Sequence, residues 1–276
     1  MNNFWTRTFT SGAFVALMLG GIQWNIWSYI GLFSVIALIG LWEFYSLVEK
    51  KETGTQKIPG LILAAILIAA SAGKYFFHVA DILGHPLAKL IILIFPLFLI
   101  IHLFNKKEMP KIFSPTLFGI LFCVLPFCYL ILSYSTMKYT DTENNARIIL
   151  GFFFLIWTND TLAYLVGRSF GKHKLFERVS PKKTWEGTLG GVLFTQVMAY
   201  ILSIYYIELA PIHWHVMGLI VSVFGTMGDL VESMFKRSLG VKDSGSILPG
   251  HGGILDRFDG VLVSAPFVVA YLMMIQ

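Results

Sequence analysis

Charged residues are scarce in this sequence of 276 residues, because lysine, arginine, aspartate and glutamate together make up only 13% of it. Soluble domains carry roughly twice that share. Hydrophobic residues reach 56%, and the mean hydropathy is +0.70. The scarcity of charge therefore excludes an ordinary soluble domain and predicts an integral membrane protein.

Cysteine and net charge are also low. Cys123 and Cys128 lie in one apolar segment, and their spacing of five puts them on different faces of a helix. We interpret them as buried apolar side chains and not as a disulfide or metal site. The net charge of +5 is small for a nucleic-acid-binding protein, so no nucleic-acid partner is expected.

Long apolar runs fill most of the chain, and none of them alternates as the strands of a membrane barrel do. A helix needs about 20 mostly apolar residues to cross a bilayer. We therefore predict an all-α polytopic bundle of about nine transmembrane helices near residues 8–24, 27–48, 58–80, 87–104, 112–135, 148–168, 187–209, 213–235 and 260–275. The first run resembles a signal peptide but lacks a small-residue cleavage site, so we expect a retained helix.

The basic residues predict the orientation of this bundle. With a cytoplasmic N-terminus, 17 of the 21 lysines and arginines fall in cytoplasmic segments, which is the usual bias. The C-terminus then lies outside. Residues 1–147, which hold few ionisable groups, are expected to form scaffold and lipid-facing surface. Residues 148–276 are expected to form the catalytic part, with cytoplasmic loops 168–186 and 236–259.

The most polar stretch, residues 233–259, lies between the last two predicted helices. Its charged residues are Lys236, Arg237, Lys242, Asp243, His251, Asp256, Arg257 and Asp259. The two glycines after His251 allow a backbone to approach a ligand closely. If the chain is helical beyond them, Asp256 and Asp259 share one face, as a divalent cation held with phosphates requires. The alternative is a solvated connector, which the mixed charges and the glycines disfavour.

One acidic residue lies at membrane depth in the predicted helix 148–168. An ionised aspartate there costs several kcal/mol unless it faces a wet cavity or a partner, so Asp160 is a candidate functional residue. The alternative is a polar contact between helices that involves Asn159 and Tyr164.

A second acidic group lies at the end of the predicted helix 213–235. Asp229, Glu232, Ser233 and Lys236 follow one helical stripe at spacings of three and four. Acids below and bases at the rim indicate a site for a metal ion with phosphates above it. For Glu232 alone, the alternative is a structural ion pair with Lys236.

A basic segment precedes the predicted helix 187–209. Ser180 followed by Pro181 predicts a helix start, with Lys182 and Lys183 in its first turn. Backbone amides and two ammonium groups at a helix start form an anion site, and phosphate is the expected anion. Attraction to anionic head groups is the alternative for the neighbouring bases Lys172, Lys174 and Arg178.

At these residues the chain resembles the phosphatidate cytidylyltransferases, also called CDP-diglyceride synthases. The resemblance rests on Ser233, Lys236-Arg237, Lys242-Asp243, His251-Gly252-Gly253 and Asp256-Arg257-Phe258-Asp259. The segments 160–171 and 180–187 are also similar to the family's, so the likeness covers residues 150–260. It implies that CTP reacts with phosphatidic acid to give CDP-diacylglycerol and pyrophosphate, with Mg²⁺ as cofactor.

The resemblance, together with the pattern of charges, gives each residue an expected role. Metal ligands would be Asp229, Asp256 and Asp259, which with Lys236 and Arg237 form the expected catalytic set. Substrate phosphates would be bound by Ser180, Lys182, Lys183, Lys242, His251 and Arg257. Asp160 and Asp243 would complete the metal shell or orient a lysine. A second metal ion and a homodimer remain open.

Two rival functions remain at this point. A CTP-dependent polyprenol or other lipid kinase would share the helices and the phosphate chemistry. An ion-coupled secondary transporter would use the embedded acids for protons or sodium, although such transporters usually show internal repeats, which are not visible here. For the enzyme we expect a bacterial plasma membrane, with the active site on its cytoplasmic side and the lipid bilayer around the helices.

Overall fold

The structure, a computed structural model, describes residues 3–49, 55–77, 86–104, 115–136, 142–245 and 252–275. In these ranges the chain is helical apart from connections and one short antiparallel hairpin. The elements are α1 (Asn3–Gln23), α2 (Ile26–Val48), α3 (Lys57–Phe77), α4 (Pro86–Phe104), α5 (Pro115–Gly119), η2 (Ile120–Val124), α6 (Leu125–Thr136), α7 (Thr142–Phe170), β1 (Lys174–Phe176), β2 (Ser180–Thr184), α8 (Trp185–Tyr205), α9 (Pro211–Ile220), η3 (Val221–Gly225), α10 (Thr226–Ser238) and α11 (Leu255–Met274).

Two helical stretches continue through a π-helical turn. α5, η2 and α6 follow one another without a break, as do α9, η3 and α10. The residues that flank each π turn keep right-handed helical dihedrals, so each stretch is a single rod. A π turn widens a helix locally, and such turns often lie near functional sites. The turn η3 lies directly before α10, which carries Asp229.

The helices coincide with the predicted apolar runs, which supports an all-α membrane protein. Among the described residues, six stretches are long and apolar enough to cross a membrane: 26–48, 115–134, 145–170, 185–205, 211–238 and 255–274. The helices over 8–23 and 57–73 are apolar but shorter. On α8, Leu189, Leu193, Val197 and Ile204 form an exposed apolar stripe. Exposure of such a stripe to water is unfavourable, whereas its contact with lipid chains is not.

The predicted helix start at Ser180 is wrong. Residues 180–184 form strand β2, which pairs antiparallel with β1 in the register Lys174 with Thr184 and Phe176 with Ser180. The helix begins at Trp185 instead, because Thr184 is extended and its Oγ1 accepts a hydrogen bond from the Gly187 amide. A threonine cap of this kind satisfies an amide that the first helical turn leaves without a partner.

α11 is the most enclosed helix of the described chain, and its buried residues run from Leu255 to Met273. Its Phe258 packs edge-on against Phe127 of α6 and Phe153 of α7, with ring centroids 5.5 and 6.4 Å apart. Phe33 of α2 stacks on Phe153 at 5.8 Å. Such aromatic contacts add to the packing free energy. They fix α11 among helices from both halves of the chain.

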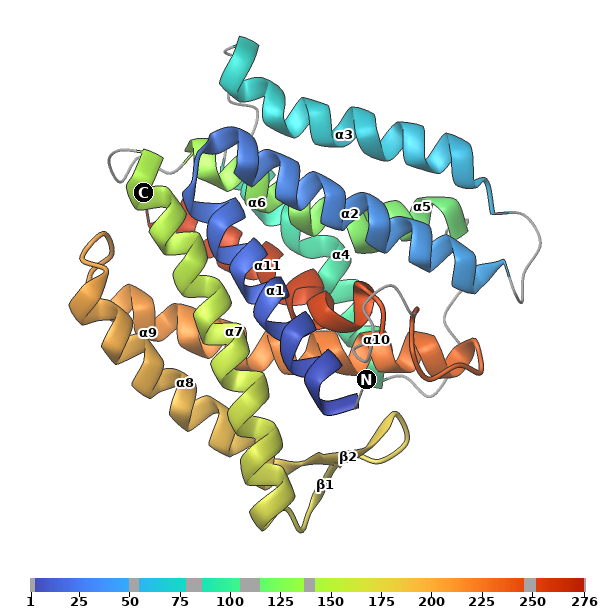
Figure 1. Cartoon of the computed structure of the whole chain (residues 1–276), viewed down its shortest axis with the longest axis vertical. Helices are drawn as coiled ribbons and strands as arrows, with labels where there is room; N and C mark the ends of the chain where they lie inside the picture. Colours follow the sequence, from blue (N-terminus) through green and yellow to red (C-terminus); the bar gives the residue numbers. More distant parts are fainter. Residues whose placement is uncertain are drawn as a thin grey trace.

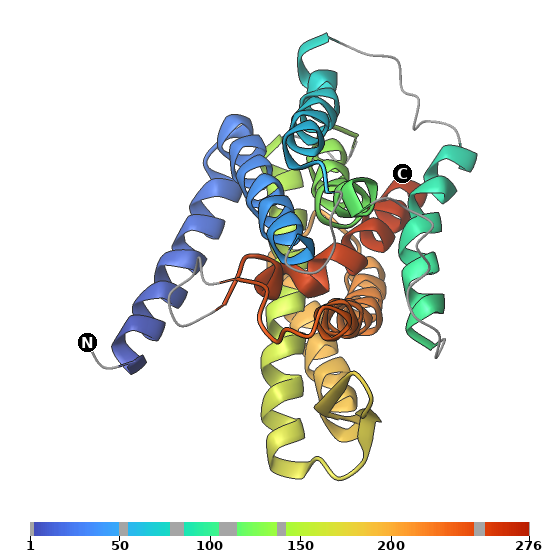
Figure 2. The ribbon, with the colours of Figure 1, turned by 90° about the vertical axis from the view of Figure 1, so that its right-hand side faces the viewer.

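The polar elements gather in one half of the molecule. The β1–β2 hairpin extends to one side of the end of α7 and the start of α8 (Figure 1). The N-terminal end of α1 lies in that same half (Figure 2). Figure 2 also shows the described parts of the connection between α10 and α11 on the side that faces α1.

Candidate active site

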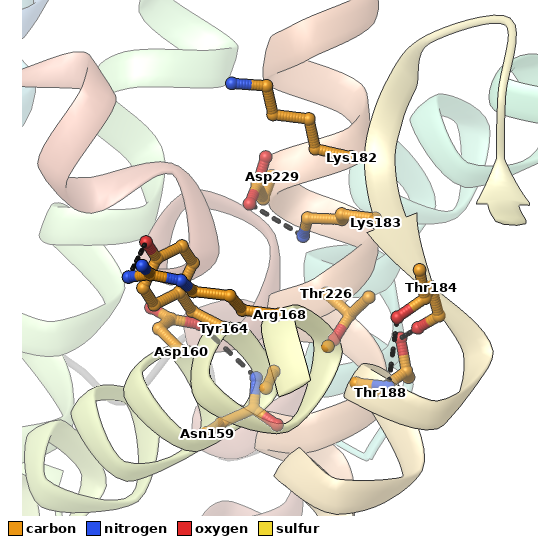
Figure 3. Close-up of a pocket in the computed structure, with 13 residues that line it drawn as sticks. Asn159, Asp160, Tyr164, Arg168, Lys182, Lys183, Thr184, Thr188, Thr226 and Asp229 are labelled. Atoms are coloured by element: carbon orange, nitrogen blue, oxygen red, sulfur yellow. Dashed lines mark hydrogen bonds and ion pairs between the residues drawn. The ribbon is translucent and has the colours of Figure 1, made fainter. Parts of the chain in front are cut away.

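A cavity of about 500 Å³ lies where the hairpin meets α7, α8 and α10, and we call it the hairpin cavity. Figure 3 shows the side chains that line it. They are Asn159, Asp160, Ala163, Tyr164, Gly167, Arg168, Lys182, Lys183, Thr184, Gly187, Thr188, Thr226 and Asp229. Basic side chains, hydroxyl groups and glycines thus surround one space, with two carboxylates beside them.

Glycines let α7 and α8 approach each other beside this cavity. A Cβ atom at Gly187 would lie 2.7 Å from the carbonyl oxygen of Ala163 and 2.9 Å from Cα of Gly167. No side chain fits at such distances, so the close backbone contact requires glycine. The cap by Thr184 involves this same glycine, with 3.2 Å between Thr184 Oγ1 and the Gly187 amide nitrogen. The strand that carries the two lysines is therefore anchored against α7.

Glu186 anchors the other end of the hairpin. Its carboxylate accepts hydrogen bonds from the backbone amides of Lys172 and His173, at 3.1 and 3.2 Å. It also lies 2.6 Å from Nδ1 of the His173 ring. Since Glu186 stands in the first turn of α8, the two chain segments that flank the hairpin are tied to one helix start. The hairpin is thereby held in one orientation over the cavity.

Lys183 forms the central ion pair of the hairpin cavity, with 2.6 Å between its Nζ and Oδ2 of Asp229 (Figure 3). Burial by itself would lower the pKa of the Lys183 ammonium group, but the carboxylates of Asp229, Asp259 and Asp160 raise that pKa above its ordinary value. Lys183 therefore stays charged near neutral pH. Acids from α7, α10 and α11 thus act on one cation, although the sequence separates them widely.

A second cavity of about 490 Å³ adjoins the first, and we call it the acidic cavity. Its lining residues are Thr10, Ser11, Phe14, Val15, Trp157, Asp160, Thr161, Asp229, Asp256, Arg257 and Asp259. Asp160 and Asp229 line both cavities. The wall on the α1 side is partly apolar, since Phe14 and Val15 belong to it. Two shared carboxylates therefore lie between a basic space and a space with acidic and apolar walls.

Close packing of α10 on α11 brings the acids of these helices together. A Cβ atom at Gly228 would contact the carbonyl oxygen of Asp259 and would lie 3.2 Å from Cα of Gly260. The absent side chain at Gly228 thus allows Asp259 to lie next to the turn that carries Asp229. Oδ1 of Asp259 accepts a hydrogen bond of 2.7 Å from the Gly260 amide.

Lys236 and Asp256 form a separate, partly buried cluster. Lys236 Nζ lies 2.5 Å from Oε2 of Glu232 and 2.6 Å from Oδ1 of Asp256, and the Lys236 side chain is 12% exposed. Asp256 also accepts hydrogen bonds from the amides of Ser244, at 2.9 Å, and Gly253, at 2.8 Å. Both oxygens of Asp256 are therefore engaged. This cluster joins α10 and α11 and holds the two ends of the connection between them.

The expected metal ligands are thus divided between two environments. Asp229 and Asp259 lie near Asp160 and Lys183, whereas Asp256 bonds to Lys236 and to backbone amides. Within the described ranges, no group of three or more histidine, cysteine, aspartate or glutamate side chains has the arrangement of a metal centre. Beside the hairpin cavity, Asp229 also has a partner on each oxygen, because Lys183 lies at Oδ2 and the Ser233 hydroxyl donates to Oδ1 at 3.3 Å.

The other predicted site residues lie at different places. Arg257 lies in the first turn of α11 and lines the acidic cavity. Arg237 is exposed, and its guanidinium donates to the carbonyl oxygen of Val241 at 3.3 Å. Lys242 and Asp243 are exposed, and neither they nor the half-buried Ser180 belong to the lining of the two cavities. His251 lies outside the described residues.

Two contributions come from the N-terminal half, for which the sequence indicated only scaffold. α1 provides four lining residues of the acidic cavity. Glu43 of α2 is 4% exposed and accepts a hydrogen bond from the amide of Leu255 at 3.1 Å. A signal for Glu43 was present, because it is the lone charged residue between positions 8 and 48, and an acid in an apolar span is a functional candidate. The α1 residues carry no such signal.

Comparison with known proteins gives concordant similarities. A family model described as "Cytidylyltransferase family" matches residues 5–275. A protein of Staphylococcus haemolyticus (strain JCSC1435) named "Phosphatidate cytidylyltransferase" is 34% identical over 255 residues, which covers 91% of this chain and 90% of that protein. A protein of the same name from Staphylococcus aureus (strain COL) is 45% identical over 149 residues. In that alignment the chain spans 56% of the relative's length and 53% of its own.

Proposed function

The chain belongs to the cytidylyltransferase family, and from that premise we propose that it transfers CMP from CTP to phosphatidic acid in phospholipid biosynthesis. The products are CDP-diacylglycerol and pyrophosphate. The name of the similar Staphylococcus haemolyticus protein supports this substrate pair. The observation that carries the proposal is the pair of adjoining cavities, one basic and one partly apolar, which share Asp160 and Asp229.

The hairpin cavity suits the triphosphate of CTP. Lys182, Lys183 and Arg168 line it and supply positive charge. Gly167 and Gly187 also belong to the lining, and their missing side chains let α7 and α8 close this end of the cavity. Arginine and lysine are the side chains that proteins use most directly to bind phosphate. A nucleotide would enter this cavity from the water side, where the hairpin lies.

The acidic cavity suits the lipid substrate. Arg257 provides a cation for a phosphate monoester, and Phe14, Val15 and Trp157 provide apolar wall for the glycerol and the first acyl carbons. α1 belongs to this wall, so the lipid would enter sideways between helices. The two substrates would then lie on either side of the shared carboxylates of Asp160 and Asp229.

The chemistry needs little from a general base. An oxygen of the phosphatidic acid phosphate, which is already anionic at neutral pH, attacks the α-phosphorus of CTP. The bond from that phosphorus to the bridging oxygen breaks, and pyrophosphate leaves with the electron pair. Catalysis then consists of positioning and charge neutralisation. Lys183 is suited to neutralise developing charge, since it stays protonated in the hairpin cavity beside Asp229, which both cavities share.

Mg²⁺ is part of the proposal. Mg²⁺ is usually bound by one or two carboxylates together with substrate phosphates, not by a complete protein cage. Asp229 and Asp259, with Asp160 nearby, provide such a donor set, in which the ion would replace Lys183 or Ser233 as a partner of Asp229. Asp256 is tied to Lys236 and to backbone amides. When bound, the ion would offset the negative charge of the triphosphate. A second ion and a homodimer are compatible with this arrangement.

The membrane topology belongs to the same proposal. We infer nine membrane-crossing rods, a cytoplasmic N-terminus and an active site at the cytoplasmic surface of a bacterial plasma membrane. The gathering of the hairpin, the end of α10 and the start of α11 in one half of the molecule supports this orientation, because these segments are rich in basic residues, among them Lys182, Lys183, Lys236, Arg237 and Arg257. Residues 148–276 then supply most of the catalytic groups, with added walls from residues 1–147.

A direct assay tests the function. Purified protein in mixed micelles is incubated with Mg²⁺, phosphatidic acid and CTP labelled in its cytosine. We expect label in the lipid extract as CDP-diacylglycerol, together with one equivalent of pyrophosphate. Release of CDP with phosphorylation of a polyprenol or another lipid alcohol would indicate the kinase alternative. Absence of labelled lipid across these substrates would refute the proposal.

A further inference from the structure

Glu43 is a buried acid of α2 that meets the connection between α10 and α11. Its side chain is 4% exposed. Oε2 accepts a hydrogen bond from the Leu255 amide at 3.1 Å and lies 3.5 Å from the hydroxyl oxygen of Ser244, which donates to it. These two partners stand on either side of residues 246–251 in the sequence. One carboxylate from the distant α2 therefore contacts both flanks of this segment.

The glycines beside Glu43 show how closely the chain surrounds it. A Cβ atom at Gly245 would lie 2.5 Å from Oε1 of Glu43, and one at Gly253 would lie 2.7 Å from that oxygen. Neither glycine has a positive φ, so nearby atoms and not backbone strain limit these positions. The absent side chains leave room for the carboxylate, and a larger residue at either position would displace it.

The Leu255 amide is one of the amides that the first turn of α11 leaves without an intrahelical partner. Ile254, at the N-cap, provides no side-chain hydrogen bond. Glu43 takes over that task from another helix, and a carboxylate is also favoured by the helix dipole at this end. The next residue, Asp256, holds Lys236, and Asp259 follows one turn later. The contact with Glu43 thus lies at the start of the helix that carries two of the four acids of the acidic cavity.

Packing alone does not explain an acid at this place. Oε1 of Glu43 has no hydrogen-bond partner among the described residues, although it is buried. A buried polar atom without a partner destabilises a fold, and leucine or methionine would fill the same space without that cost. The presence of an acid is therefore explained by the hydrogen bonds that Oε2 accepts from Leu255 and Ser244.

We propose that Glu43 is a positioning residue for the transfer reaction: it fixes the start of α11, and through it Arg257 and Asp259, relative to α10. This inference rests on the proposed function. A misplacement of about 1 Å at a reacting centre can lower a rate by about 100-fold. Loss of Glu43 should therefore affect catalysis, although neither Glu43 nor its partners Ser244 and Leu255 line either cavity.

The first test compares Glu43→Ala and Glu43→Gln with the wild type, using protein that elutes as one folded species. Glu43→Ala should lower kcat/KM for phosphatidic acid by about 100-fold, while KM for CTP changes by less than about threefold. Glu43→Gln keeps an acceptor oxygen and should retain most of the activity. The matched control is Glu49→Gln, at the end of the same helix, where Glu49 pairs with Lys57 at 2.6 Å and is 41% exposed. It should leave both constants unchanged.

The second test uses the contact with Gly245. Gly245→Ala should lower activity in the wild-type background, because the new methyl group displaces the Glu43 carboxylate. In the Glu43→Ala background the same change should have little further effect, since the space is then free. Equal losses in the two backgrounds would refute the contact, and so would near wild-type activity of Glu43→Ala. Equal inactivity of the Gln and Ala variants would also overturn the acceptor role.

Hydrogen exchange separates this inference from the proposed function. In Glu43→Ala, the Leu255 amide should exchange faster than in the wild type, whereas amides of the β1–β2 hairpin should not change. This measurement requires no substrate. If the wild type makes no CDP-diacylglycerol, the proposed function fails while the positioning of α11 is still tested. Unchanged exchange at Leu255 would refute the positioning role even in an active enzyme.

Discussion

Replacement of Lys183 by methionine gives the sharpest test of the hairpin cavity. Methionine keeps most of the side-chain volume but removes the ammonium group that lies 2.6 Å from Asp229. Two effects should follow. The hairpin cavity loses the cation beside Asp229, and the carboxylates of Asp229, Asp160 and Asp259 lose the charge that offsets them.

The magnitude can be estimated from comparable sites. Removal of one preorganised donor directed at developing charge costs about 2.7–4 kcal/mol, or about 10²–10³ in kcat. We therefore expect Lys183→Met to lower kcat by about 100- to 1,000-fold in the micelle assay with labelled CTP. Lys183→Arg keeps the charge but changes the donor geometry, so it should retain more activity than the methionine variant.

The control for this experiment is Lys174→Met in strand β1. Lys174 is exposed and does not belong to the lining of either cavity, yet it belongs to the same hairpin. It should retain wild-type activity. The thermal midpoint of each purified variant should be measured as well, so that loss of folded protein is recognised. A folded Lys183→Met variant with more than about a third of the wild-type kcat would refute the electrostatic role, because removal of one such donor lowers kcat by about 10²–10³.

Four further predictions address the acids, the cofactor and the topology. Asp259→Asn should abolish CDP-diacylglycerol formation without a change in the size-exclusion profile, and retention of most activity would contradict its role beside Asp229. Asp256→Asn should instead lower the thermal midpoint by several degrees, since Lys236 loses the charged partner that ties α10 to α11 and a hydrogen bond to a charged group contributes about 1.5–3 kcal/mol; an unchanged midpoint would count against a structural bridge. Chelation of divalent ions should stop the reaction and added Mg²⁺ should restore it, whereas full activity in excess chelator would exclude the proposed cofactor. A reporter placed after Gln276 should be found outside the cytoplasm, and a cytoplasmic signal would contradict nine crossings.

The helical fold could be predicted because lipid imposes one requirement on every spanning segment. Backbone groups must bond within the segment, so a long apolar run predicts a helix whatever its neighbours are. The segment at Ser180 lies outside the six stretches that are apolar enough to cross a membrane, so that requirement does not apply to it. There the serine and proline indicated a helix start, but strand pairing with β1 and the cap by Thr184 determined the outcome. In such a loop a local signal for a helix start does not decide the structure, because strand pairing can satisfy the same backbone groups.

The candidate site was predictable as a set of residue types but not as a set of contacts. Asp160, Asp229 and Lys183 were all expected to be functional, and the structure brings them together at the hairpin cavity. Lys236 and Asp256 also lie close to each other, but as a bridge between helices. Spacing on one helix could not reveal this difference, because the partner of each side chain comes from another helix.

The sequence by itself determined that the chain is a helical membrane protein. It also identified the charged residues that lie in or beside apolar segments, where a charge is costly unless it has a partner or a function. Tertiary structure decided which of these charges meet: Lys183 with Asp229, Lys236 with Glu232 and Asp256, and Glu43 with the start of α11. The physical reason is that hydropathy acts on each segment separately, whereas an ion pair or a cap depends on the approach of two segments. That approach is set here by glycines and aromatic packing between helices far apart in the chain.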